Sequence, residues 1–206
     1  MKIRPAATAA LVAASALAAL APSQAFAAPQ APPCTKKNIA YLDAQNHHED
    51  AEAKVTASEQ ALDRAKADRA KVDHLGKLAE GLENRLRWER SERSLRVADK
   101  IQSEQSVLDE AVWKHDAVAS AEAAVKLADA TDRAFKDEGD TEGHVATEHV
   151  KALREGAEKA RSATEAPNVE ARQADLDAAR TELTKAAKAV RPARDAYRDC
   201  LDKLVS

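Results

Sequence analysis

Aromatic residues are scarce in this sequence, and glycine and cysteine are scarcer still. Aromatics make up 3% of the 206 residues, and there are five glycines and two cysteines. Few bulky side chains are therefore available to line a deep ligand pocket. The alternating runs of β-branched and aromatic residues that strands prefer are also missing, whereas Ala, Leu, Glu, Lys and Arg are abundant. The composition excludes a β-rich fold and predicts an all-α protein.

The motifs that most often reveal an enzyme are missing as well. The glycines form neither a G-x-G nor a G-x-x-x-x-G-K pattern, so the loops that cradle phosphate groups are absent. No G-x-S-x-G elbow and no H-E-x-x-H zinc motif occurs. We therefore expect no catalytic residues, no cofactor and no enzymatic activity.

An excess of positive charge is also missing. The chain has 32 basic and 35 acidic residues, which gives a net charge of −3. Because affinity for nucleic acid comes mainly from Lys and Arg, this balance argues against a nucleic-acid partner.

The N-terminus has the order of a secretory signal peptide. Lys2 and Arg4 precede an apolar stretch from Ala6 to Ala21, and Pro22 then leads to an A-x-A pattern that ends at Ala27. The apolar run is shorter than the roughly 20 residues of a membrane span, so cleavage after Ala27 is favoured over a retained anchor. We expect a secreted, extracellular product without stable membrane insertion. The abundance of Ala and Arg suggests a bacterial source.

Cleavage would leave a mildly acidic chain with a simple domain organisation. The product from residue 28 onward has 179 residues, 27 fewer than the full 206, and a net charge of about −5 because Lys2 and Arg4 are lost. Residues 28–34 form a short Pro-rich linker. Residues 35–206 are predicted to form a single α-helical coiled-coil domain.

The C-terminal segment carries a seven-residue repeat of large side chains, which is typical of a coiled-coil seam. Its members are Val169, Leu176, Leu183, Val190, Tyr197 and Leu204. The companion seam positions are mostly small: Arg172, Ala179, Ala186, Ala193 and Cys200. A matching seam follows Thr35, with large residues at Tyr41, His48, Val55 and Leu62 and small ones at Ala44, Ala51, Ser58 and Ala65.

The two cysteines predict how these seams pair. An exported chain with two thiols favours a disulfide, here between Cys34 and Cys200. If the two helices are antiparallel and the cysteines face each other, Tyr41 lies opposite Ala193 and Val55 opposite Ala179. Large side chains then meet small ones, which permits close packing of the helices.

Clusters of turn-forming residues predict the breaks between helices. They occur at Gly76 to Gly81, at Asp137 to Gly143, and at Ala166 to Asn168. The predicted helices are Thr35 to Leu75, Leu82 to Lys136, His144 to Glu165 and Asn168 to Leu204. A turn at Ser91 to Ser94 is the alternative to the first break and would lengthen the first helix. The predicted fold is an elongated antiparallel bundle or coiled coil of about four helices, with the first and last paired.

Two tryptophans and a group of arginines are the candidate binding residues. Trp88 lies among Arg85, Arg87, Arg90, Arg93 and Arg96. Glutamates precede three of these arginines by four residues (Glu83 and Arg87, Glu89 and Arg93, Glu92 and Arg96), which favours a self-paired, solvated helix. The alternative is a patch that binds a partner's carboxylates or an anionic polymer. Trp113 is expected to pack in the core, and an exposed interaction anchor is the alternative.

Metal binding is the weaker interpretation of the remaining histidines. His47, His48 and Glu52 form one candidate group, and His144 and Glu148 form another, but a structural metal site usually needs four ligands. The acidic segment at Asp137 is interpreted as a solvated turn. We expect no bound metal.

These observations favour a non-catalytic scaffold or interaction protein of the extracellular space or cell envelope. Its partner would be another secreted or envelope protein, or a second copy of this chain. The first alternative is a binding module or inhibitor that acts on a secreted protein through Trp88 and the arginines. The second alternative, an antibacterial or membrane-active helical protein, is disfavoured by the acidic charge.

Overall fold

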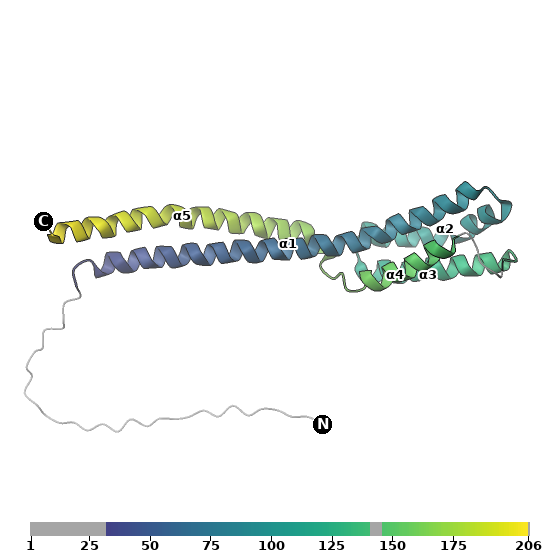
Figure 1. Cartoon of the computed structure of the whole chain (residues 1–206), viewed down its shortest axis with the longest axis horizontal. Helices are drawn as coiled ribbons and strands as arrows, with labels where there is room; N and C mark the ends of the chain where they lie inside the picture. The colour runs from purple at the N-terminus through teal and green to yellow at the C-terminus, as the bar shows by residue number, and fades with distance from the viewer. Residues whose placement is uncertain (1–31, 141–145, 206) are drawn as a thin grey trace, which may run out of the picture.

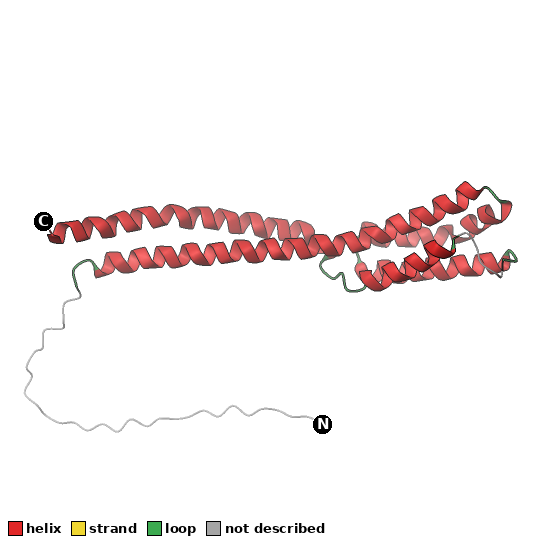
Figure 2. Cartoon of the chain, viewed as in Figure 1, coloured by secondary structure: helices red, strands yellow, loops and turns green. Residues whose placement is uncertain are grey.

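The computed structural model describes residues 32–140 and 146–205. In these residues the chain forms helices and no strand (Figure 2). The elements are α1 (Thr35–Glu89), α2 (Glu92–Trp113), α3 (Ala117–Asp137), α4 (Thr147–Ala160), the short 3-10 helix η1 (Ala166–Asn168) and α5 (Val169–Val205). The all-α prediction is confirmed. The predicted signal peptide, with its cleavage point after Ala27, and residues 28–31 of the predicted linker lie outside the described residues.

The helices form two connected parts along one long axis (Figure 1). In the stem, the first part of α1 packs antiparallel to α5. In the bundle, the last part of α1 packs with α2, α3 and α4. The chain runs up α1, returns along α2, goes out again along α3 and comes back through α4 and then α5. The described ends of the chain therefore meet at one end of the molecule, far from the α1–α2 turn.

The predicted seams form the contact surface of the stem. Every seam residue named above for the first helix is buried or half-buried, and so is every one in α5 except Leu204. Most of the fully buried stem residues are small, such as Ala51, Ala65 and Ala186, so the two helices can approach closely. At the outer end the disulfide between Cys34 and Cys200 joins α1 to α5, as predicted, with a Cα–Cα distance of 5.8 Å.

The individual partners across the stem differ from the predicted ones. The ring of Tyr41 stacks on Tyr197, with 6.3 Å between the ring centroids, whereas the prediction placed Tyr41 opposite Ala193. Glu59 accepts a hydrogen bond from Arg180 at 2.9 Å, whereas the register set by the cysteines places Glu59 opposite Asp175, earlier in α5. The cause is the tilt of every Cα–Cβ bond toward the N-terminus of its own helix. In an antiparallel pair, longer side chains therefore meet partners that lie later in α5 than the cysteine register indicates.

The bundle has a core of larger side chains than the stem. Its fully buried residues come from all four helices and include Leu82, Ile101, Leu127, Phe135 and Leu153. Each buried Leu, Ile or Phe side chain contributes about 1.5–3 kcal/mol of hydrophobic stabilisation. Most of the apolar stabilisation of the molecule therefore belongs to the bundle.

The predicted break at Gly76 to Gly81 is wrong, and the alternative turn near Ser91 is confirmed. Helix α1 continues through both glycines and ends at Glu89. A Cβ atom at Gly76 would lie 3.3 Å from Val112 Cγ1, so this glycine allows α2 to pack closely on α1. Gly76 thus serves interhelical packing, and neither glycine forms a turn.

A second break, between α2 and α3, was not predicted. The predicted helix from Leu82 to Lys136 is interrupted at Lys114 to Asp116, where His115 adopts a left-handed conformation with φ of 53°. Asp116 caps the new helix because its carboxylate accepts a hydrogen bond from Ala119 N–H at 2.9 Å. The described chain therefore has five α-helices where four were expected. The predicted break at Asp137 to Gly143 begins at the end of α3. The predicted break at Ala166 to Asn168 is occupied by η1, directly before α5, and α4 ends earlier than predicted, at Ala160.

The junction of stem and bundle is held by a fork of hydrogen bonds. The guanidinium of Arg69 in α1 binds both carboxylate oxygens of Glu170 in α5, at 2.5 and 2.7 Å, and also donates to the carbonyl oxygen of Ala166 at 3.1 Å. Such bidentate pairs are among the stronger polar contacts in proteins.

Within residues 32–140 and 146–205, no helix combines the length and apolarity needed to cross a membrane.

Candidate functional site

The candidate site lies at the far end of the bundle, where α1 turns into α2. Arg90 ends α1 in the left-handed conformation, with φ of 53°, a region that favours glycine. Ser91 then caps α2, since its hydroxyl oxygen accepts a hydrogen bond from Ser94 N–H at 3.0 Å. The buried Ser94 hydroxyl in turn donates to Glu89 at 2.6 Å. These bonds hold the turn in one conformation.

An open hollow of about 660 Å³ lies beside this turn. Its lining residues are Gly81, Asn84, Arg85, Arg87, Trp88, Arg90 and His149. Six of these seven residues lie at the end of α1 or directly after it. The seventh, His149, comes from the first turn of α4. Three arginines and a histidine line this hollow, one of them, Arg87, being paired with Glu83, and no carboxylate of the described residues lines it. The lining therefore suits an anionic group.

Trp88 stands out from the helix at the edge of this hollow. It is 75% exposed, an unusual state for so large an apolar side chain. The guanidinium of Arg85 lies 5.9 Å from the centroid of its ring, at the outer limit of a cation–π contact. The pair presents an apolar surface beside a positive charge.

The arginines around Trp88 differ in their partners. Arg87 donates to Glu83 at 2.7 Å, and hydrogen bonds from Arg87 and from Gln105 hold the pKa of Glu83 below its usual value. The predicted pair of Glu89 with Arg93 does not form, because the helix ends between them and Glu89 binds Ser94 instead. Within the described chain, Arg85, Arg90 and Arg93 form no ion pair. The self-pairing expected of this segment is only partly realised.

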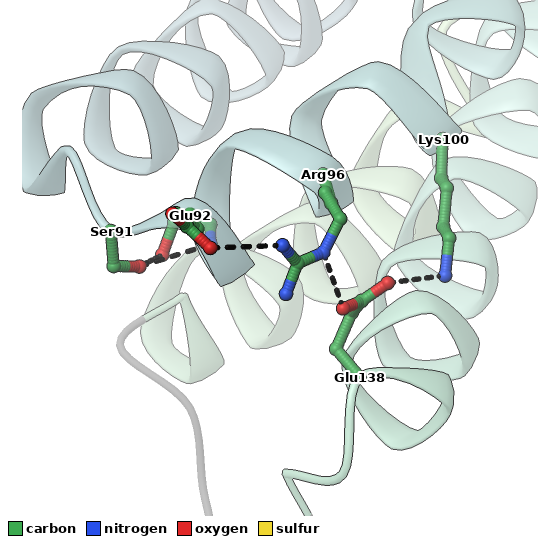
Figure 3. Close-up of polar contacts among 6 residues, drawn as sticks. Ser91, Glu92, Arg96, Lys100 and Glu138 are labelled. Carbon is green, nitrogen blue, oxygen red and sulfur yellow. Dashed lines mark hydrogen bonds and ion pairs between the residues drawn. The ribbon is translucent and has the colours of Figure 1, made fainter.

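The guanidinium of Arg96 is paired with carboxylates of its own chain and is not free to bind a partner. It donates to Glu138 at the end of α3 at 2.7 Å, and Lys100 donates to the same carboxylate at 2.7 Å (Figure 3). The hydrogen bonds from Lys100 and Arg96 lower the pKa of Glu138. The predicted contact of Arg96 with Glu92 is present at 3.5 Å. This cluster fixes the start of α2 against α3, behind the turn.

Trp113 does not belong to the same site. It is 77% exposed at the end of α2, so the expectation that it packs in the core is wrong. Helix α2 has 22 residues, and at about 1.5 Å per residue it places Trp113 roughly 30 Å from the α1–α2 turn. Trp113 is the last residue of α2, and its exposure shows that no helix of the described residues covers it.

Three lining residues were not among the predicted site residues: Gly81, Asn84 and His149. Asn84 lies one helical turn before Trp88, so a helical projection of α1 could have identified it. No sequence signal identifies His149, because its position depends on how α4 packs against α1.

Only the first of the two candidate histidine groups lies wholly within the described residues. Among the described residues, no three His, Cys, Asp or Glu side chains gather as metal ligands. His48 contacts Glu52 at 3.7 Å on the stem. His144 lies outside the described residues.

Comparison with known proteins adds no functional assignment to this geometry. No family model matches the chain, and neither the curated proteins nor the solved structures include one with significant similarity.

Proposed function

We propose that the chain is a secreted, non-catalytic scaffold or interaction protein of the extracellular space or cell envelope. In this proposal the stem is a spacer that holds the bundle away from the disulfide-linked end of the molecule. The observation that carries the proposal is a long two-helix stem that ends in a bundle (Figure 1). The α1–α2 turn forms the tip of this bundle, and the adjacent Trp88 is exposed. The signal-peptide pattern and the Cys34–Cys200 disulfide support an oxidising compartment.

The dimensions suit a spacer better than a pocket protein. Helix α1 has 55 residues and is about 80 Å long at 1.5 Å per residue. The stem is held along its length by contacts such as Lys54 with Glu182 at 2.9 Å and Arg69 with Glu170. The Cys34–Cys200 disulfide at one end of the stem and the Arg69–Glu170 pair at the other limit bending of the stem.

An affinity column tests this function. The oxidised chain from residue 28 onward is immobilised through its C-terminus, so that the tip points away from the matrix, and the culture medium and envelope fraction of the source organism are passed over it. We expect a protein to be retained in near-stoichiometric amount. A column that carries an unrelated acidic helical protein is the control. Equal retention on both columns, or conversion of a medium component by catalytic amounts of the chain, would contradict the proposal.

A second candidate function is a binding module or inhibitor that acts directly on another secreted protein. The observation that favours it is the exposed Trp88 beside Arg85 and Arg90, which form no ion pair within the described chain. Trp88→Ala separates the two candidates. If the partner binds at the tip, the substitution abolishes partner capture. If the partner binds along the stem, capture is unchanged.

A further inference from the structure

The tip of the bundle has the composition of a site for carboxylates. Arg85 and Arg90 line the hollow with Trp88, and Arg93 follows three residues after Arg90 in the first turn of α2. Within the described residues none of these three arginines is neutralised by an ion pair. A guanidinium binds a carboxylate through two parallel hydrogen bonds, and Trp and Arg are the residues that most often dominate binding energy at protein interfaces. We propose that this tip binds a short acidic segment of a partner protein, with Trp88 as the apolar anchor and the three arginines as carboxylate ligands. The inference rests on the binding-module candidate above.

The backbone of the turn supports this assignment. Arg90 occupies a left-handed position that glycine would adopt without strain. An arginine at such a position costs about 1 kcal/mol, and residues held in unfavourable conformations occur preferentially at functional sites. The bonds of Ser91, Ser94 and Glu89 fix the turn before any partner arrives, which lowers the entropy lost on binding.

The distribution of charge favours a short acidic segment over a long polyanion. The whole chain has a net charge of −3, so the arginine cluster is a local positive region on an acidic molecule. A long polyanion that extended from the tip would be repelled by the remaining surface. A segment with a few carboxylates can be confined to the hollow, whose lining contains no acidic side chain among the described residues.

His149 gives the hollow a second wall. Its ring faces Gly81, where a Cβ atom would lie 3.5 Å from Cδ2, and its buried Nδ1 has no hydrogen-bond partner among the described residues. Because this nitrogen is buried, His149 contributes to the wall of the hollow and does not contact the ligand through Nδ1.

Fluorescence titration with hexaglutamate tests the proposal. In the Trp113→Phe variant of the oxidised chain, Trp88 is the only tryptophan and reports on the tip alone. We expect hexaglutamate to change its emission in a saturable manner with one site per chain, and hexaglutamine to leave it unchanged. The triple variant Arg85→Gln, Arg90→Gln, Arg93→Gln should weaken binding at least about tenfold.

A matched control separates the site from general charge. The variant Arg64→Gln, Arg133→Gln, Arg198→Gln removes the same charge from three exposed arginines that also form no ion pair in the described chain, and should change affinity by less than about twofold. Circular dichroism verifies that each variant is folded. The triple Arg→Lys variant at the tip retains the charge but loses the planar fork, so it should bind measurably less tightly.

Three outcomes would overturn the assignment. They are no response of Trp88 to hexaglutamate, equal loss of affinity in the tip and control variants, and tighter binding of hexagalacturonate, which has the same number of carboxylates on a carbohydrate. If the affinity column retains a partner but hexaglutamate does not bind to the tip, this site is refuted and the proposed function is not. Binding of hexaglutamate without any retained partner would refute the function but not the site.

Discussion

At the scale of single residues, Arg90 combines a conformational cost with a proposed role. Its φ of 53° is unfavourable for a residue with a Cβ atom. We expect Arg90→Gly to raise the free energy of unfolding by about 0.5–1 kcal/mol, because the strain is relieved. The same substitution should weaken hexaglutamate binding. Urea denaturation followed by circular dichroism measures the first effect, and a loss of stability would argue against strain at this position.

Gly156 controls how closely α4 approaches α1. A Cβ atom there would lie 2.9 Å from Leu75 Cδ2 and 3.1 Å from Leu78 Cδ1. We expect Gly156→Ala to lower the free energy of unfolding by about 1–2 kcal/mol, since the packing clash outweighs the gain in helix propensity.

Gly81→Ala is the matched control for Gly156→Ala, because both glycines lie inside helices. A Cβ atom at Gly81 would make an ordinary contact with the His149 ring at 3.5 Å. This variant should be neutral or more stable by up to about 0.8 kcal/mol. If both glycine variants lose the same stability in urea denaturation, close packing at Gly156 is not the cause.

The residues of the candidate site could be predicted in part. Trp88 and the arginines share one short segment, so their proximity follows from the sequence. The exposure of Trp113 did not follow, because a residue near a helical seam is buried only if a neighbouring helix extends over it. His149 depends on the packing of α4 and has no local signal in the sequence.

At the scale of helices, the attachment of α5 to α1 depends on the Arg69–Glu170 pair. The hydrogen bond from Arg69 lowers the pKa of Glu170 from 4.5 to about 2. A carboxyl whose pKa is lower in the folded state stabilises the fold above its unfolded pKa, and this contribution is lost as the pH falls toward the folded pKa. The junction should therefore weaken as the pH falls from about 4.5 to about 2.

The Glu170→Gln variant tests this pH dependence. Since Gln does not titrate, the variant should be less stable than the wild type at pH 6, and the difference should narrow as the pH falls to 3. Glu155→Gln, an exposed position on α4 away from the junction, is the control. Urea denaturation at several pH values gives the comparison. Parallel curves for the wild type and Glu170→Gln would show that the pair contributes no pH-dependent stability.

The helix boundaries were predictable only where local chemistry determines them. Pro167 lies in η1 directly before α5, where its missing N–H has no helical partner to lose, so it marks the start of the last helical segment. Gly76 and Gly81 suggested a turn, but a helix tolerates an isolated glycine when a neighbour packs against it. The break at His115 contains neither glycine nor proline, so only the capping ability of Asp116 indicated it.

At the scale of the whole molecule, the disulfide stabilises the outer end of the stem. On the loop-closure model, a crosslink across 166 residues removes at most about 4–5 kcal/mol of unfolded-chain entropy. In the double variant Cys34→Ser, Cys200→Ser, we expect faster hydrogen exchange at the start of α1 and the end of α5. Exchange in the bundle should change little, because its core has larger buried side chains. Uniform acceleration along the chain would contradict this division.

The central claim is that a clasped stem and a distal bundle form one extended monomer, and small-angle scattering of the oxidised chain from residue 28 onward tests it most directly. The account predicts a monomer with a maximum dimension of at least about 80 Å, set by the 55 residues of α1. A compact domain of this size would have a diameter of about 40 Å. A monomer of that compact size, or a particle with the mass of a crosslinked dimer, would contradict the arrangement.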